Sequence, residues 1–342
     1  RTFRLDNAAR GNTPKPTLKT IAKLTGLAVP TVSRALSGAE DINIDTRARV
    51  RAVADEIGYV PNRAGVRLRT GRTNVISLVM STEHDVMNHT AKLISSVAGG
   101  LRNTPFHLNI TPYFADEDPM KPIRYIVESG SADAVIFNQI KGQDPRVRYL
   151  LDRKFPFATH GRSDWSDQHA WFDFDNGSYG SLGVRSLAAR GRKHILLIAP
   201  PIDQSYGAAM IAGATAAAQH AGVSLAVMPG LSSDSPVDTI EAQLAAMLRD
   251  GDKTDGIIGG STNSALAAVA AVESCGRVLG DDADVFTKEA ITFLRRVRPR
   301  ILAIHEDVAA AGDFLARAAM SLVRTPEAPP QQHLDVPPDT PL

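Results

Sequence analysis

From Asn74 onward, short apolar runs alternate with amphipathic segments whose apolar residues recur at helical spacing. The runs read NVISLVM, FHLNIT, ADAVIFN, FPFAT, AWFDFD, HILLIAP, VSLAVM, DGIIGG and RILAIH, and the segments between them include LISSVAGGLR, LGVRSLAARG and SALAAVAAVESCG. Short strands that alternate with helices pair in parallel, because each helix returns the chain to the starting edge of the sheet. The pattern therefore predicts an α/β body of two doubly wound subdomains with a ligand-binding cleft between them.

Length and composition limit the classes of protein to which this chain can belong. A chain of 342 residues is too long for one small domain, so two or three domains are expected. No apolar run approaches the roughly 18 residues that a membrane span needs, and no signal-peptide pattern opens the sequence. The one cysteine, Cys275, excludes an internal disulfide and fits a reducing compartment. These features predict a cytoplasmic protein with no membrane partner.

Charge is divided unevenly along the chain. Residues 1–74 carry fourteen Lys or Arg against six Asp or Glu, a net charge of +8, whereas the remaining residues have a net charge of −7. A basic segment on an acidic body indicates a polyanionic partner for that segment alone. A solvated charged face is the alternative that charge by itself leaves open.

The basic segment contains three stretches of helical spacing. Thr17 can cap the first, LKTIAKLTG, and Gly26 can end it in the left-handed conformation. Pro30 stands in the first turn of the second stretch, where proline is tolerated, and Asn43 can cap the third, IDTRARVRAVADEIG. A glycine-containing turn of about four residues separates the first two stretches, which is helix-turn-helix spacing. We therefore expect a small all-α bundle, with an ordinary helical hairpin as the alternative.

The second helix of a helix-turn-helix lies in the major groove with its N-terminal residues against the bases. Helical spacing turns the apolar side chains of PTVSRALSG toward the bundle, namely Val32, Ala35 and Leu36. Thr31 and Ser33 carry short hydroxyl side chains that can reach phosphates or bases, and Arg34 can offer its fork to guanine or phosphate. The stretch therefore predicts double-stranded DNA as the partner.

Two longer stretches resemble one known family. TLKTIAKLTGLAVPTVSRALSG and INIDTRARVRAVADEIGYVPNRAGVRLRTGRTNVISLV are similar to the lac repressor and purine repressor family of bacterial transcription regulators. The resemblance implies a hinge helix in GYVPNRAGVRLRTG that forms on operator DNA, with Leu68 wedged between base steps. It places on base-reading positions Val29, Pro30 and Arg34, and on backbone-contacting positions Thr17, Thr31, Ser33 and Asn62. Family members usually carry a polar cap where this chain has Ala28.

The resemblance also implies the order of the domains and the partners. The body would be a periplasmic-binding-protein-like domain that binds a small-molecule effector and forms a homodimer or a tetramer. DFDNGSYGSLGVRSLAARGRKHILLIAPP resembles the family's crossover into its second subdomain. We expect a flexible basic arm over residues 1–15, a helix-turn-helix domain over 16–60 and a hinge over 61–73. An effector-binding domain over 74–325 and a proline-rich tail over 326–342 should follow.

Ligands of doubly wound folds bind beyond the carboxyl ends of the strands. The candidate effector-binding residues chosen by that rule are Ser81, Asn138, His160, Arg162, Asp175, Asn176, Ser261 and Asn263. Further polar or glycine residues follow the same strands, namely Thr82, Glu83, His84, Gln139, Gly161 and Thr262. Hydroxyl, amide and carboxylate groups suit a sugar, and Trp165 or Trp171 could stack on its ring. For each residue alone, an exposed loop position is the alternative.

The body departs from the family at two places that bear on the effector. Met210 stands where the family commonly has an arginine, three residues before the glycine of MIAG. Lys288 and Glu289 replace an acidic pair within VFTKEAI. A simple galactoside or a purine is therefore not assumed, and we expect a disaccharide or another glycoside.

Other kinds of site find little support in the sequence. The nine histidines form neither an H-x-x-x-H pair nor a Cys/His cluster, so no metal or other cofactor is expected. No G-x-S-x-G nucleophile motif occurs, and GIIGGS fits a tight strand-to-helix turn better than a phosphate site. The leading hypothesis is a ligand-responsive repressor. The alternatives are an α/β sugar-processing enzyme fused to a DNA-binding module and a structural nucleoid-type DNA binder.

Overall fold

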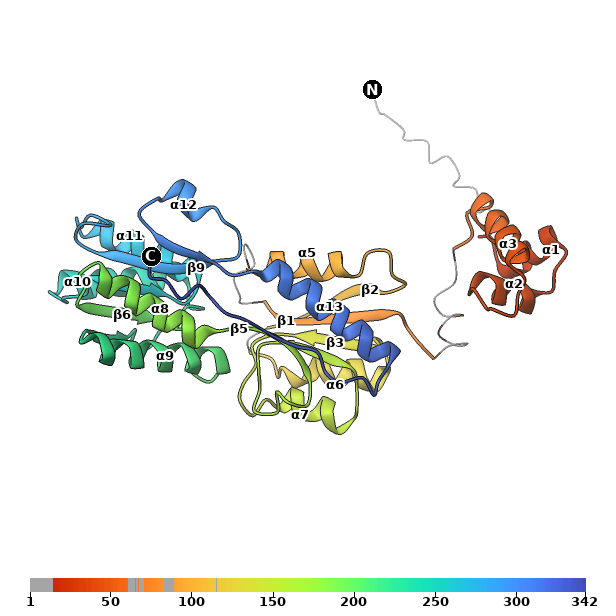
Figure 1. Ribbon diagram of the computed structural model, residues 1–342, viewed down its shortest axis with the longest axis horizontal. Helices are drawn as coiled ribbons and strands as arrows, with labels where there is room; N and C mark the ends of the chain where they lie inside the picture. Colours follow the sequence, from red (N-terminus) through yellow and green to blue (C-terminus); the bar gives the residue numbers. More distant parts are fainter. Residues whose placement is uncertain (1–14, 61–64, 66, 68–70, 83–88, 115) are drawn as a thin grey trace, which may run out of the picture. The chain divides into compact units, whose positions relative to one another are not determined.

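The computed structural model describes residues 15–60, 65, 67, 71–82, 89–114 and 116–342. Its chain divides into two compact units, Arg1–Thr73 and Asn74–Leu342, each with its own hydrophobic core (Figure 1). In the described residues, no helix is both long enough and apolar enough to cross a lipid bilayer.

The first unit contains a bundle of three helices, which are α1 (Leu18–Thr25), α2 (Val29–Leu36) and α3 (Ile44–Glu56). Its core is small and is formed by Ile21, Val32, Ala35, Val50 and Ala54. The predicted helix ends are confirmed, since Thr17 and Asn43 cap α1 and α3 and Gly26 follows α1 with φ of 68°. Alanines at two core positions allow three short helices to approach one another closely.

The first sheet of the second unit is parallel, in the order β11-β5-β4-β3-β1-β2. Its strands are β1 (Val75–Ser81), β2 (His107–Tyr113), β3 (Ala134–Phe137), β4 (Phe157–His160), β5 (Ala170–Phe174) and β11 (Gln332–Asp335). One face packs on α5 (Ala91–Gly100) and α13 (Val308–Arg324), and the other on α6 (Met120–Ser129) and α7 (Pro145–Asp152). In β3, Ile136 joins the first of these cores and Phe137 the second, as strand alternation requires.

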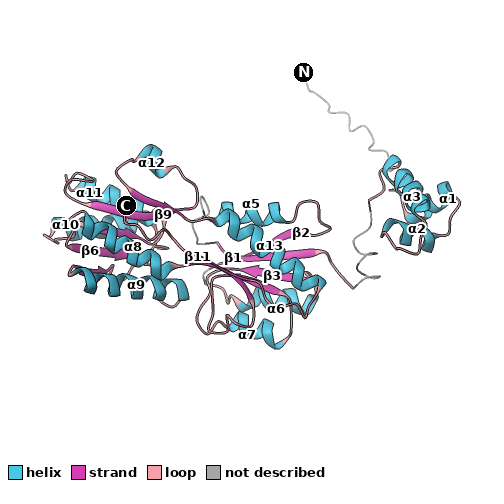
Figure 2. Ribbon diagram, in the orientation of Figure 1, coloured by secondary structure: helices cyan, strands magenta, loops and turns pink. Residues whose placement is uncertain are grey.

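The second sheet is also parallel, in the order β10-β9-β8-β6-β7. Its strands are β6 (His194–Ile198), β7 (Ser224–Val227), β8 (Gly256–Gly259), β9 (Asp284–Glu289) and β10 (Leu302–His305). The helices α10 (Val237–Arg249) and α11 (Thr262–Ser274) cover one face, α8 (Asn176–Ala189) and α9 (Ser205–Ala221) cover the other, and the short α12 (Leu294–Val297) follows β9. The second unit therefore consists of two doubly wound halves, as predicted, and Figure 2 shows their strands.

Glycines allow α8 and α9 to pack unusually closely. A Cβ on Gly180 would lie 2.3 Å from the Met210 carbonyl oxygen, and a Cβ on Gly213 would lie 2.0 Å from the Gly177 carbonyl oxygen. Any side chain at these positions would push the two helices apart. The regular glycines of GSYGSLG thus serve helix packing.

Three segments of the chain pass between the two sheets. The first leads from β5 into α8, where the sequence predicts the crossover, and the second leads from β10 into α13. The third is the end of the chain, which leaves β11 and contacts α8 (Figure 1): Arg185 donates to an Asp339 carboxylate oxygen at 2.8 Å, and the Leu342 amide donates to the Ser186 hydroxyl at 3.1 Å. Three connections therefore join the two halves of the second unit.

The structure corrects the predicted elements in two places, because β9 and β11 are not among the predicted strands. The run DVFTKE is rich in polar residues, but its Asp284 is fully buried beside Arg190 and Arg192, at 3.0 and 2.7 Å. The strand β11 lies inside the predicted proline-rich tail, 326–342, and pairs with β5 at the edge of the sheet. An edge strand tolerates flanking prolines, since one side of it needs no partner.

Candidate functional site

The helix-turn-helix begins with a capping box. The Thr17 hydroxyl accepts from the Thr20 amide at 3.4 Å, and the Thr20 hydroxyl accepts from the Thr17 amide at 3.1 Å. Ala28 precedes α2 without a side-chain cap, and Pro30 stands in the first turn of that helix. The start of α2 therefore depends on the fixed φ of proline rather than on a polar cap.

The second helix turns its predicted reading residues away from the bundle. Val32 and Ala35 are 0% and 2% exposed, whereas Pro30 and Arg34 are exposed. The other predicted contact residues of this helix are partly exposed, namely Val29, Thr31 and Ser33. The Arg34 guanidinium pairs with the Asp41 carboxylate, and more than half of each side chain is exposed. Such a pair costs little to break, so Arg34 is available to a partner.

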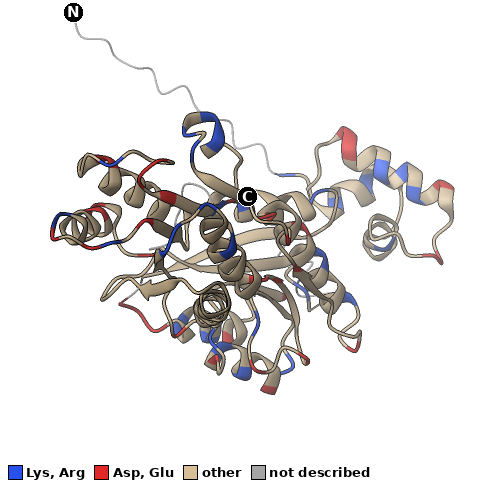
Figure 3. Cartoon of the chain, turned by 60° about the vertical axis from the view of Figure 1, so that its left-hand side comes forward, with Lys and Arg blue, Asp and Glu red and all other residues tan. Residues whose placement is uncertain are grey.

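Two arginines of α3 have structural roles that a count of charges does not reveal. Arg49 donates to the Thr25 carbonyl oxygen at 2.7 Å, and Arg47 donates to the Gly38 carbonyl oxygen at 3.2 Å. Both carbonyl groups lie at the C-terminal ends of helices, where a positive charge is favourable. Figure 3 shows the Lys and Arg residues on the ribbon. Part of the basic charge of the first unit thus holds its own helices together.

Some predicted contact residues lie outside the described part of the chain. These are Asn62 and Leu68 of the predicted DNA surface, and Glu83 and His84 of the predicted ligand set. Most of the predicted hinge and all but residue 15 of the predicted arm also lie outside it.

A cavity of about 900 Å³ lies at the carboxyl ends of strands from both sheets of the second unit. The predicted residues that line it are Ser81, Asn138, Gln139, His160, Gly161, Asn176, Ser261, Thr262 and Asn263. Other side chains that line it include His89, Tyr113, Asp173, Phe174, Gln204, Tyr206, Asp234, Lys288 and Glu306. Because both sheets contribute to its wall, a ligand in this cavity contacts both halves of the body.

Two amide oxygens of this cavity have no hydrogen-bond partner within the described residues. They are Asn138 Oδ1 and Gln204 Oε1, and both atoms are buried. An unsatisfied buried acceptor costs about 1–3 kcal/mol, so both positions favour a ligand that brings donors. Hydroxyl groups are such donors, and the rings of Tyr113 and Tyr206 in the same wall offer apolar faces.

Lys288 connects three parts of the cavity wall. Its ammonium lies 2.9 Å from Glu306 Oε2, donates to Asn176 Oδ1 at 3.0 Å, and lies 4.7 Å from the centroid of the Phe174 ring. Burial alone would raise the pKa of Glu306, but Lys288 and the nearby His89 outweigh it and hold that pKa well below its usual range. Glu306 is therefore a carboxylate at neutral pH.

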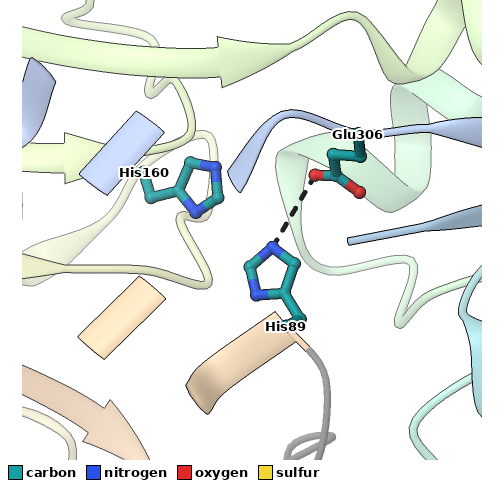
Figure 4. A group of neighbouring side chains, drawn as sticks. All are labelled: His89, His160 and Glu306. Carbon is teal, nitrogen blue, oxygen red and sulfur yellow. Dashed lines mark ion pairs between the residues drawn. The ribbon is translucent and has the colours of Figure 1, made fainter. Parts of the chain in front are cut away.

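Two imidazole rings stack beside Glu306 (Figure 4). The centroids of the His89 and His160 rings are 5.2 Å apart, and the ring planes differ by 13°. Burial lowers the pKa of His160 to about 3, with a smaller contribution from His89. The His160 ring is therefore neutral at physiological pH.

The predicted contact residue Arg162 occupies a different place. It does not line the large cavity but a neighbouring hollow of about 250 Å³, where its Nε donates to Asp173 at 2.7 Å. Its guanidinium also lies 5.4 Å from the centroid of the Trp171 ring. Burial raises the pKa of Asp173 although Arg162 acts in the opposite direction. Neither Trp171 nor Trp165 lines the large cavity, whereas the aromatic residues Tyr113, Phe174 and Tyr206 do.

The predicted effector-binding residue Asp175 caps a helix and does not line the cavity. Its carboxylate accepts from the Ser178 amide at 3.0 Å and from the Ser178 hydroxyl at 2.8 Å, and thus caps α8. The strand β5 ends at Phe174, so Asp175 already faces the helix that follows. Asp173, two residues earlier, is the carboxylate that lines the cavity.

Several lining residues escaped the reasoning from sequence. Glu306 follows β10, whose apolar run the sequence shows, so the carboxyl-end rule applied to that run would have found it. Lys288, which the sequence marked only as a departure from the family pattern, belongs to the unpredicted strand β9. Gln204 and Asp234 lie in connections that carry no signal of their own. GIIGGS forms a tight turn in which Ser261 caps α11 through a capping box with Ser264.

Two families match separate parts of the chain. Bacterial regulatory proteins of the lacI family match residues 17–62, and the periplasmic binding protein-like domain matches residues 184–341. The transcriptional regulator AglR of Rhizobium meliloti is 29% identical over 325 residues, which cover 93% of this chain and 90% of AglR. The transcriptional regulator RafR of Escherichia coli is 37% identical over 191 residues, which cover 55% of this chain and 56% of RafR.

Solved structures of similar fold extend the likeness to nearly the whole chain. The lac repressor dimer bound to operator and the anti-inducer ONPF has a TM-score of 0.81 at 19% identity, over 94% of this chain and 97% of that one. A complex of the transcriptional regulator CelR with cellobiose has a TM-score of 0.68 at 22% identity, over 95% of this chain and 98% of that one. These likenesses agree with the order of a helix-turn-helix followed by two doubly wound halves.

Proposed function

Because the chain belongs to the lacI family of bacterial regulatory proteins, we propose that it is a repressor whose operator affinity is controlled by a sugar or glycoside. The curated relatives reported above are transcriptional regulators, so the alternative of a sugar-processing enzyme lacks support. One observation carries the proposal. The chain that presents the exposed Arg34 on a helix-turn-helix also holds a cavity in which the Asn138 and Gln204 oxygens lack donors.

The effector is a glycoside of two or more rings. A cavity of about 900 Å³ is near the upper end of the range for small-molecule sites, about 300–1,000 Å³. Its polar groups include the amides of Asn138 and Gln204 and the carboxylate of Asp173, all of which accept from hydroxyl groups. The bound cellobiose of the CelR structure supports a disaccharide.

The DNA partner is a near-palindromic operator bound by a homodimer. We assign base contacts to Val29, Pro30 and Arg34, backbone contacts to Thr17, Thr31, Ser33 and Asn62, and the minor-groove wedge to Leu68. The exposure of Pro30 and Arg34 on α2 supports this assignment, as does the operator-bound lac repressor dimer. Such a regulator works on chromosomal DNA, which places it in the cytoplasm at the nucleoid.

The effector acts by shifting a population of conformations. The cavity wall includes Asn138 after β3 of one sheet and Ser261 after β8 of the other. A ligand that binds both walls favours the relative orientation of the halves in which all its contacts form. Operator binding and effector binding then change each other's affinity by the same factor.

The first experiment is a thermal-shift screen of sugars, since a ligand stabilises the fold that binds it. The hit is then titrated into the protein–operator complex. In the variant Asn138→Leu, which keeps the side-chain shape but removes the acceptor, the ligand midpoint should rise about 5- to 100-fold, because one buried hydrogen bond is lost. Operator affinity without ligand should not change.

Asp175→Ala is the matched control. This variant removes the α8 cap outside the cavity and should lower the free energy of unfolding by about 1 kcal/mol. Its ligand midpoint should equal that of the wild type. A wild-type midpoint in Asn138→Leu would refute the assigned cavity. If no sugar stabilises the protein in the screen, but a small molecule of another class releases the operator, the proposed effector class is refuted.

A further inference from the structure

Three side chains that are far apart in the sequence converge in the cavity wall (Figure 4). They are His89 before α5, His160 at the end of β4 and Glu306 after β10. One nitrogen or oxygen atom of each lies within 4.8 Å of the others, and His89 Nε2 is 3.7 Å from Glu306 Oε1. Among the described residues, these three side chains form a group whose nitrogen and oxygen atoms could bind a metal ion.

We propose that His89, His160 and Glu306 bind a divalent transition-metal ion of the zinc type. Two imidazoles and one carboxylate form a donor set that Zn²⁺ takes readily, with a fourth position left for water or a ligand. Among the described residues, neither ring nitrogen of His160 takes part in a hydrogen bond. An imidazole without a hydrogen-bond partner, beside a carboxylate, has a lone pair free for a metal.

Closing the site needs only small side-chain movements. Zinc bonds of about 2.0–2.2 Å place tetrahedral ligand atoms about 3.4 Å apart, so from 4.8 Å each atom moves about 1 Å. Because the two ring planes differ by 13°, at least one ring also turns about its Cβ–Cγ bond. Such terminal torsions are soft in histidine.

The positive charge of Lys288 lowers the affinity of the proposed site for a metal ion. Its ammonium lies 2.9 Å from Glu306 Oε2 and leaves Oε1, the oxygen nearer His89, for the metal. A positive charge so close to the site weakens the binding of a cation. Removal of that charge should therefore tighten metal binding, whereas removal of either histidine should weaken it.

A metal here would join the two halves of the body. His89 and His160 belong to the half built on the first sheet, whereas Glu306 lies on the segment that leaves β10 of the second sheet. The open coordination position would face the cavity, where a hydroxyl-bearing ligand can occupy it. The site does not depend on the proposed function, because it can be measured on the free protein without DNA or sugar.

The experiment titrates ZnCl₂ into the full chain without an affinity tag, by calorimetry, and records the visible absorption of Co²⁺ in the same site. We expect one Zn²⁺ per chain at micromolar affinity and a tetrahedral Co²⁺ spectrum that Zn²⁺ abolishes. His89→Gln and His160→Gln should each weaken binding at least about 10-fold, and Lys288→Met should strengthen it. His305→Gln is the matched control, since His305 is exposed and its Nδ1 lies 3.2 Å from the Glu289 carbonyl oxygen.

Thermal unfolding of each variant without metal separates loss of the site from loss of the fold. Should a histidine variant fail to fold, the wild-type spectrum and the Lys288→Met affinity still decide. The proposal is overturned if the wild type binds no Zn²⁺ at micromolar concentrations. It is equally overturned if His160→Gln binds like the wild type, which would assign the ion to surface histidines.

Discussion

Replacement of Arg34 by alanine tests whether α2 reads bases in the major groove. Arg34 is exposed on α2, and its guanidinium pairs with Asp41, which lies in the connection between α2 and α3. A guanidinium that forms two hydrogen bonds to a guanine edge discriminates against the wrong base by about 1–3 kcal/mol. The loss should therefore be larger on the cognate operator than on random DNA.

The ion pair between Arg34 and Asp41 reduces the expected loss of binding free energy. Arg34 must leave Asp41 before it contacts a base, and the pair is largely exposed, with side chains 58% and 52% accessible. Pairs of this exposure contribute up to about 1 kcal/mol. Taken from the middle of the range above, about 2 kcal/mol, this leaves a cost of about 1–2 kcal/mol for Arg34→Ala on the operator. That cost corresponds to about a 5- to 30-fold weaker affinity.

Asp41→Asn is the partner variant. It frees Arg34 and removes a carboxylate near the DNA, so operator affinity should rise by up to about 1 kcal/mol. In the Arg34→Ala background that gain should shrink, because the share that depends on freeing Arg34 is gone. Fluorescence anisotropy with labelled operator and random duplex, at one fixed salt concentration, measures all four proteins.

Equal losses on operator and random DNA would show that Arg34 contacts phosphate and would refute base reading. Additive effects of the two substitutions would refute the competition between Asp41 and DNA. Thermal unfolding of each protein guards against an effect on the bundle itself, which the exposure of both side chains argues against.

Three further predictions concern the stability of the body. Burial alone would raise the pKa of Asp144, but hydrogen bonds from Arg146 lower it. The ionised carboxylate therefore stabilises the fold above the unfolded-state pKa of about 3.9, and this stabilisation is lost as pH falls through the lower folded-state pKa. In Asp144→Asn the free energy of unfolding should depend less steeply on pH in the acid range and should not exceed that of the wild type. Gly213→Ala should cost about 1–3 kcal/mol in urea unfolding, since its Cβ meets an α8 carbonyl oxygen at 2.0 Å, and an unchanged midpoint would contradict the close packing. Tyr179→Phe should cost about 1–2 kcal/mol by the same assay, because the hydroxyl donates to the Gly259 carbonyl oxygen at 2.6 Å inside the core.

The sequence alone determined the elements whose causes are local. Thr17, Gly26 and Asn43 mark helix ends because each acts on backbone within four residues of itself. Apolar runs mark nine strands; central ones such as β3 and β8 are apolar because a strand buried on both faces has little room for polar residues. The carboxyl-end rule then led to Asn138 and Ser261 at the cavity, since topology places the ends of parallel strands at one edge.

Only the tertiary structure decided which side chains meet. Asp173 faces the cavity and Asp175 caps α8, although both stand at the end of the same strand, because the chain turns between them. Lys288 is tolerated in a buried wall because Glu306, from another strand connection, supplies its counter-charge. His89 and His160 stack although 71 positions separate them in the sequence. Such contacts depend on how two sheets and their connections face each other, and no local periodicity carries that information.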